Sequence, residues 1–206
     1  MRFFCANCFN ARNFSTQFSP MTVFNSSSKL LQRTRASRRV DALDYDYLRD
    51  EVASRLVGRL FDIQRKFPNA LDLGGNSGNI AAQLLAQSKD EGSFPGGVKT
   101  LHVLEPCQGM LDRAASSHTA VEAAGLHVIP TLHPLEGGSL PYQDATLDMV
   151  MSSMALHWVN DVPGVLAEVL RVLKPDGVFI CALLGGESLQ ELRYVDFQFR
   201  GPQPPV

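Results

Sequence analysis

The sequence predicts a doubly wound α/β domain with a mostly parallel sheet. Short apolar runs alternate with helix-like stretches between residues 70 and 184, and parallel strands require such crossover connections. A chain of 206 residues, of which 45% are hydrophobic, is long enough for one domain of this class. The net charge of −2 gives no general electrostatic reason to bind nucleic acid. No apolar run approaches the roughly 20 residues of a transmembrane helix.

The elements follow in order along the chain. An amphipathic helix is expected over residues 44–67, where leucines and valines share one stripe, and Pro68 ends it. Helices are then expected at residues 79–88, near 109–115 and near 162–173, and a long surface loop at 87–99. Five strands are expected, at residues 70–73, 100–104, 127–132, 147–152 and 178–184.

The two ends of the chain differ from this core. Residues 1–40 hold seven basic residues and no acidic one, whereas the rest of the chain holds twelve basic and 21 acidic residues. A leader rich in arginine and serine and free of acids is typical of a mitochondrial transit peptide, and a disordered basic tail is the alternative. Residues 194–206 form an irregular, proline-rich tail that cannot continue the sheet, which indicates a truncated chain. The domain itself is expected over residues 41–193.

A glycine-rich turn follows the first strand and offers a ligand site. Asp72 lies on the strand, Gly74 and Gly75 follow it, and Gly78 precedes the next helix. Glycines let the backbone approach a ligand, and a helix N-terminus offers unpaired N–H donors. The spacing matches neither a nicotinamide fingerprint nor a P-loop. Asn76 tolerates left-handed backbone angles, but its side chain is expected to crowd a ligand in the turn. A turn that needs its glycines only for packing is the alternative.

Further candidates follow the other strands. Glu105 ends the second strand, where an acid can accept hydrogen bonds from both hydroxyls of a ribose. Glu136 follows the third strand and can accept from an adenine amino group, or it is an ordinary exposed acid. His157 and Trp158 follow the fourth strand on the side where a substrate is expected, and a stacked packing pair is the alternative reading.

Two smaller patterns complete the candidates. Asn160 and Asp161 precede a helix that starts near Pro163, so helix capping is the leading interpretation of both. Cys5 and Cys8 have the spacing of metal ligands, but no second pair follows them. We therefore expect no metal site.

Three stretches together resemble the type 11 branch of class I methyltransferases: LDLGGNSG, LHWVND and LKPDGVFICALLGG. More closely, DYLRDEVASRL, FPNALDLG, SSMALHWVNDVPGVL and LKPDGVFICALLGGESLQELR resemble the mitochondrial complex I assembly factor 5 family. The resemblance runs from about residue 21 to residue 193.

The resemblance implies a Rossmann-like fold that binds S-adenosylmethionine and whose last strands are missing here. It also implies a protein of the mitochondrial matrix, peripheral to the inner membrane, that acts on complex I subunits or assembly intermediates. Members of the family are linked to hydroxylation of an arginine. Asp72, Gly74 and Gly78 match the family's cofactor turn, with Gly75 at a variable site and Asn76 in place of a glycine.

Further along the chain, Glu105 matches the family's ribose acid and Glu136 its adenine-side acid. His157 and Trp158 match only by pattern, so no catalytic residue is assigned. Three hypotheses remain open: a cofactor-using enzyme of complex I assembly that hydroxylates or methylates, a non-catalytic assembly module with a degraded pocket, and a methyltransferase acting on small acids.

Overall fold

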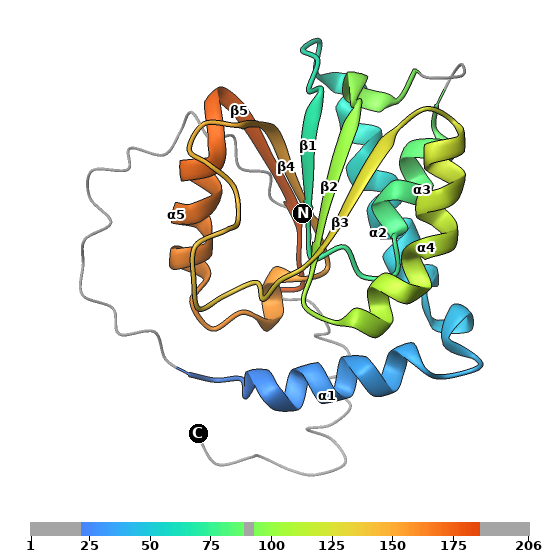
Figure 1. The fold of residues 1–206 in the computed structure, drawn as a ribbon, viewed down its shortest axis with the longest axis vertical. Helices are drawn as coiled ribbons and strands as arrows, with labels where there is room; N and C mark the ends of the chain where they lie inside the picture. Colours follow the sequence, from blue (N-terminus) through green and yellow to red (C-terminus); the bar gives the residue numbers. More distant parts are fainter. Residues whose placement is uncertain (1–21, 89–92, 186–206) are drawn as a thin grey trace, which may run out of the picture.

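The computed structural model describes residues 22–88 and 93–185 and confirms the doubly wound sheet. Five parallel strands lie in the order β3-β2-β1-β4-β5 (Figure 1). Their bounds are β1 Asn69–Leu73, β2 Thr100–Glu105, β3 His127–Leu132, β4 Leu147–Ser153 and β5 Leu173–Ala182. The chain order reverses at β1, where it moves outward to β2 and β3 and then returns to β4. A crevice outside the carboxyl ends of the strands at such a switch point is the usual ligand position.

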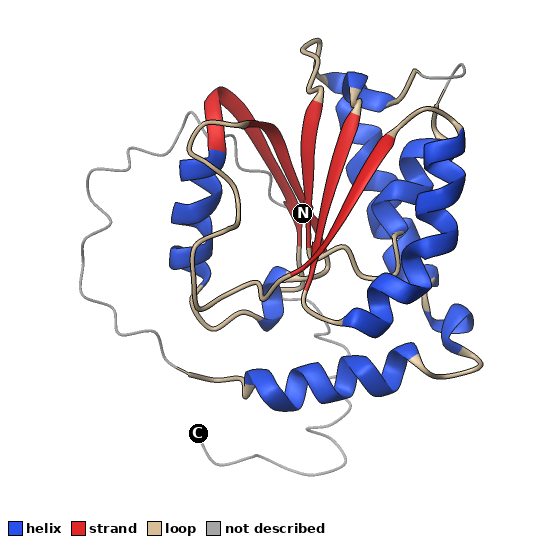
Figure 2. Cartoon of the chain, viewed as in Figure 1, coloured by secondary structure: helices blue, strands red, loops and turns tan. Residues whose placement is uncertain are grey.

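Helices cover both faces of the sheet (Figure 2). On one face lie α2, α3 and α4, whose apolar side chains pack with those of the strands in one core cluster. The opposite face packs mainly against α5. The bounds are α2 Tyr47–Gly58, α3 Asn79–Ala86, α4 Gln108–Ala123 and α5 Val162–Val172. Short 3-10 turns lie at Ala42–Tyr45, Arg59–Asp62, Pro95–Gly97 and Leu156–Trp158.

The long first helix of the prediction is wrong in its extent. The chain forms a 3-10 turn, then α2, then a second 3-10 turn that ends at Asp62, and it is not helical from Ile63 to Phe67. The stripe of apolar residues continues across the junction, and Leu60 is 1% exposed within the second turn. Apolar residues after α2 are therefore still buried against the core, although the chain there is no longer α-helical.

The last strand also differs from its predicted bounds. β5 begins at Leu173, which pairs with Leu147, and it ends at Ala182. The next residue pair in register is Met149 with Val178, so the intervening residues bulge out of the ladder. Asp176 takes a positive φ of 61° in this bulge. The predicted start of the strand is where regular pairing resumes.

An additional helix, α1 (Ser26–Ser37), lies within the basic leader. It crosses the carboxyl edge of the sheet and contacts α4 (Figure 1). Asn25 caps it, because its side-chain oxygen accepts from the Ser28 N–H at 2.9 Å. Residues 1–21 of the leader and the predicted tail at 194–206 lie outside the described residues. No helix in the described parts has both the length and the apolar composition needed to cross a membrane.

Candidate functional site

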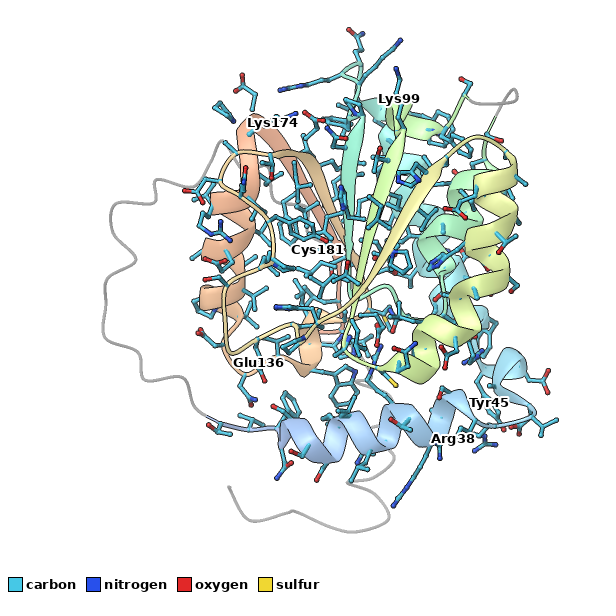
Figure 3. The ribbon with its side chains drawn as sticks, in the orientation of Figure 1. Arg38, Tyr45, Lys99, Glu136, Lys174 and Cys181 are labelled. Atoms are coloured by element: carbon cyan, nitrogen blue, oxygen red, sulfur yellow. The ribbon has the colours of Figure 1, made fainter. Side chains whose placement is uncertain are left out.

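A cavity of about 650 Å³ lies between α1 and the carboxyl edge of the sheet. Its apolar walls come from the segments that follow β2, β3 and β4, and its polar wall is α1. Figure 3 shows Glu136 at this edge, facing α1, while Lys99 and Lys174 lie at the opposite end of the strands. The residues that line it include Lys29, Arg33, Arg49, Pro106, Met110, Leu135, Glu136 and Trp158. The volume suits a small-molecule ligand.

The glycine turn packs tightly against its own domain. Gly74 and Gly78 have φ of 85° and 81°, which only glycine adopts readily. A Cβ on Gly74 would lie 2.3 Å from the Cβ of Ala155, and a Cβ on Gly75 would lie 2.3 Å from Cγ1 of Val103. Side chains at these two positions are therefore excluded by internal packing, whether or not a ligand binds.

Asn76 takes the left-handed angle expected of it and turns its amide inward. Its φ is 49° and it is 3% exposed. The Nδ2 donates at 2.9 Å both to the Gly74 carbonyl and to the Ser153 carbonyl, and so ties the end of β1 to the end of β4. The Oδ1 accepts from Arg33 at 3.2 Å. Two backbone acceptors that face the turn are thus satisfied by the chain itself.

Asp72 is a buried carboxyl group that lacks a partner. It is 1% exposed, and neither of its oxygens has a hydrogen-bond partner among the described residues. Burial, together with the negative charge of Glu105, raises the pKa of Asp72 to about 8. Asp72 is consequently protonated at neutral pH unless a cation approaches it.

Glu105 is fully buried and accepts from the Arg33 side chain and from two backbone N–H groups. Its side chain forms a two-pronged ion pair with Arg33, whose Nη2 lies 2.6 Å from Oε1 and 2.8 Å from Oε2. The Asn76 N–H donates to Oε2 and the Cys107 N–H donates to Oε1, each at 3.0 Å. The parallel pairing of Leu73 with Leu104 brings this acid beside the glycine turn. The structure therefore unites Glu105 with the turn, as expected from the strand ends.

Glu136 lines the cavity, but the loop before α5 already occupies its carboxylate. It accepts from the Asn160 N–H at 2.6 Å, from the Asn160 side chain at 2.9 Å and from the Asp161 N–H at 3.2 Å. Burial raises its pKa, but the hydrogen bonds from Asp161, Asn160 and Ser26 outweigh that effect and hold the pKa below its usual value. Through these bonds, Glu136 connects the loop after β3 to the loop before α5 and to α1.

The capping prediction is confirmed for Asp161 and wrong for Asn160. The Asp161 side chain accepts from the Gly164 N–H at 2.9 Å, as a helix N-cap does. The Asn160 side chain instead accepts from the N–H groups of Val23 and Phe24 and donates to the Phe24 carbonyl. It thereby holds the segment that leads into α1.

His157 and Trp158 have different surroundings. Trp158 lines the cavity, with the Lys29 Nζ 3.6 Å from its ring centroid and Phe24 packed edge-on at 5.5 Å. The His157 ring lies 5.0 Å from that of Trp158 at 48°. Burial, followed by the charges of Arg33 and two other cations, lowers the pKa of His157. The imidazole is therefore neutral at pH 7, and its buried Nδ1 has no hydrogen-bond partner within residues 22–88 and 93–185.

Three cationic residues at the site were not identified from the sequence. Lys29 and Arg33 belong to α1, and Arg49 belongs to α2, and all three line the cavity. Arg49 is held by an ion pair with Asp46 at 2.8 Å, and Asp46 also pairs with Arg113 and accepts from the Ser77 hydroxyl. The amphipathic pattern of α2 predicted the helix, but it gave no sign that Arg49 faces the cavity.

Comparison with known proteins gives the family of this chain. Residues 71–181 match the family model described as "Methyltransferase domain". Curated relatives named "Arginine-hydroxylase NDUFAF5, mitochondrial" are 38% identical over 182 residues in Danio rerio and 37% identical over 180 residues in Homo sapiens. These alignments cover 88% and 87% of this chain but 51% and 47% of the relatives, so the chain spans about half their length. A "Malonyl-[acyl-carrier protein] O-methyltransferase" of Methylovorus is 31% identical and aligns with 80% of this chain and 54% of its own length.

Solved structures agree on the fold. A structure of the complex between the Haloferax volcanii Trm112 methyltransferase activator and its methyltransferase partner matches with a TM-score of 0.58 and 21% identity, covering 74% of this chain and 60% of that one. The YcgJ protein of Bacillus matches with a TM-score of 0.52 and 26% identity, covering 71% and 58%. On the match over residues 71–181, whose strands and turn form the site described above, the chain belongs to the methyltransferase domain family.

Proposed function

We propose that this chain binds S-adenosylmethionine and acts in the assembly of mitochondrial complex I, where it modifies an arginine of a subunit by hydroxylation or methylation. One observation carries the cofactor part of the proposal. The buried carboxylate of Glu105 and the unpartnered carboxyl of Asp72 flank a glycine turn that lies beside a cavity of about 650 Å³. A buried acid without a partner, such as Asp72, is costly in the absence of a ligand, which supports a functional site here.

The chemistry of the donors fits the parts of this cofactor. The Glu105 carboxylate can accept from two ribose hydroxyls, and the apolar side chains of Pro106, Met110 and Leu135 provide walls for an adenine ring. Asp72, unpaired beneath the turn, suits a positively charged ammonium group. We propose that Glu136, which lines the cavity, lies beside the adenine. These roles are proposals that rest on the burial and charge of the groups.

When bound, S-adenosylmethionine supplies a methyl group that its sulfonium has already activated. The task of the protein is then mainly to orient an attacking atom and to exclude water. Trp158 and α1 line the cavity, and we propose that they lie beside the substrate. His157 is neutral, but its Nδ1 is buried and the residue is not among those that line the cavity, so no catalytic step is assigned to it.

The biological setting is proposed from the relatives. Proteins named as mitochondrial arginine hydroxylases are 37–38% identical to this chain, which supports a mitochondrial location and an arginine substrate. We place the protein in the matrix, at the inner face of the inner membrane, as a partner of complex I subunits or assembly intermediates. We also propose that the basic leader directs import and that its addressing part ends before Val23, because Asn160 binds Val23 and Phe24 and α1 packs on the domain. The N-terminus of the imported protein, read by mass spectrometry, tests this.

Cofactor binding is tested by calorimetric titration of the full chain with S-adenosylmethionine. We expect saturable binding that is weakened in Asp72→Asn, with circular dichroism to show that the variant is folded. A folded wild-type sample that gives no heat of binding would overturn the proposal. The reaction is tested by incubating the loaded protein with complex I assembly intermediates, since mass spectrometry separates an added methyl group from an added oxygen.

The alternative of a non-catalytic assembly module is favoured by Asn76. Its amide occupies the Gly74 carbonyl of the turn and the Ser153 carbonyl at the end of β4, which a ligand's amino group would otherwise use. Asn76→Gly distinguishes the two functions. If cofactor binding appears only in this variant while binding to complex I intermediates is unchanged, the natural chain acts as a binding platform.

A further inference from the structure

Helix α1 is attached to the domain in an unusual way. None of its residues is buried, although several of them line the cavity. Burial of apolar surface is the main force that fixes helices on a protein. A helix without buried residues is therefore held by its polar and ring contacts, which are weaker and reversible.

Those contacts converge on the groups of the ligand site. Arg33 pairs with Glu105, and Lys29 lies over the ring of Trp158. Ser26 donates to Glu136 at 3.1 Å, and the Thr34 hydroxyl lies 3.6 Å from the sulfur of Cys107. The helix is thus tied to both acids proposed to hold the nucleoside.

The ion pair and a ribose would compete for the same atoms. Both Glu105 oxygens receive the Arg33 guanidinium, and each also accepts one backbone N–H. Two ribose hydroxyls would need the lone pairs that Arg33 now uses. The Arg33 side chain is 19% exposed, and it separates Glu105 from the cavity.

The connection behind α1 can act as a hinge. It consists of Arg38 to Asp41, in which Val40 is fully exposed and the Arg39–Asp41 ion pair stays on the surface. Rotation about such a segment breaks none of the apolar packing of the sheet.

We propose that α1 is a hinged cover. Its docking through Arg33 and the binding of an adenosine-type ligand at Glu105 exclude one another, so the ligand displaces the helix. This inference rests on the proposed function, because it assumes that Glu105 binds the ribose. It adds that Arg33 covers Glu105 in the free protein. The apparent affinity for the ligand is then the affinity of the open form multiplied by the fraction of molecules that are open.

The neighbouring Thr34 and Cys107 allow the cover to be locked. In Thr34→Cys, mild oxidation is expected to join the new thiol to Cys107, and dithiothreitol releases it; peptide mapping confirms the bond. We expect the oxidised full-length protein to bind S-adenosylhomocysteine at least about tenfold more weakly than the reduced protein. The matched control, Thr34→Cys with Cys107→Ser, cannot form the bond and should bind equally in both states.

A second pair of variants leaves the cysteines unchanged. Arg33→Gln releases Glu105 and should bind the same ligand more tightly than wild type, whereas Arg35→Gln alters an exposed arginine of the same helix and should not. Trp158 is the chain's single tryptophan, so its emission reports the loss of the Lys29 contact. Ligand should shift this emission in wild type and leave it unchanged in the locked form.

The outcomes separate the two proposals. Weaker binding in the locked form, with recovery on reduction, supports the cover. Equal binding by the oxidised and reduced forms overturns the cover and leaves the cofactor site intact. Binding by neither form, nor by wild type or Arg33→Gln, overturns the proposed function and the cover together.

Discussion

The unpaired carboxyl of Asp72 makes a quantitative prediction for stability. Its pKa is about 8 in the folded protein and 3.8 as the ordinary value, so between these values the folded state holds a proton that the unfolded state has lost. The free energy of unfolding therefore falls as the pH rises through this window. The loss is about 1.4 kcal/mol for each pH unit, or about 4 kcal/mol between pH 3.8 and neutrality.

Asp72→Asn replaces the titrating carboxyl by an amide of nearly the same shape that does not titrate. We expect the variant to be more stable than wild type near neutral pH, with a difference that grows from about pH 5 to about pH 8. Urea unfolding followed by Trp158 fluorescence at several pH values measures it. Asp44→Asn, at an exposed site, is the control for the loss of one carboxylate. A difference between Asp72→Asn and wild type that stays constant over this pH range would refute the reasoning.

The other predictions concern the turn and its neighbours. Gly75→Ala should destabilise the fold by about 1–3 kcal/mol, because the new methyl group meets Val103; a thermal melt that matches wild type would contradict this. Asn76→Gly should strengthen binding of S-adenosylmethionine, measured by calorimetry, because it frees two backbone carbonyls; unchanged affinity would show that the amide does not compete. Asp161→Ala should cost about 1 kcal/mol through the lost N-cap, measured by urea unfolding. Asn160→Ala should leave that cap intact but speed proteolysis just ahead of α1, read by mass spectrometry, and equal cleavage rates would disprove its anchoring role.

The sheet could be predicted because each strand is a short apolar run bounded by turn residues. Parallel pairing then places the carboxyl ends of β1 and β2 together, and so Asp72, the glycine turn and Glu105 meet as expected. The boundaries of the helices and strands were harder to predict than their presence. The apolar stripe after Gly58 continues in a 3-10 turn with the same burial, and the bulge around Asp176 looks like a turn before a strand although β5 has already begun.

The cationic side of the site could not be predicted. Arg33 contacts an acid 72 positions away in the sequence, and no local pattern distinguishes it from the other arginines of the leader. Basic composition favoured a targeting segment, which depends only on charge and spacing. The position of α1 over the cavity arises from tertiary contacts, such as that of Asn160 with Phe24 just ahead of the helix. Such pairings between distant segments require the folded chain.

The crowding around Gly74 and Gly75 affects how the glycine-rich turn after β1 is interpreted in other proteins. Because Ala155 and Val103 leave no room for a side chain, selection for a well-formed sheet is enough to retain both glycines after chemistry has been lost. A paralogue that had stopped binding any nucleoside would still carry them. Asp72 behaves in the opposite way, since its buried carboxyl weakens the fold when no ligand group pairs with it. In a set of homologous sequences, replacement of Asp72 by an apolar residue would therefore mark the loss of ligand binding.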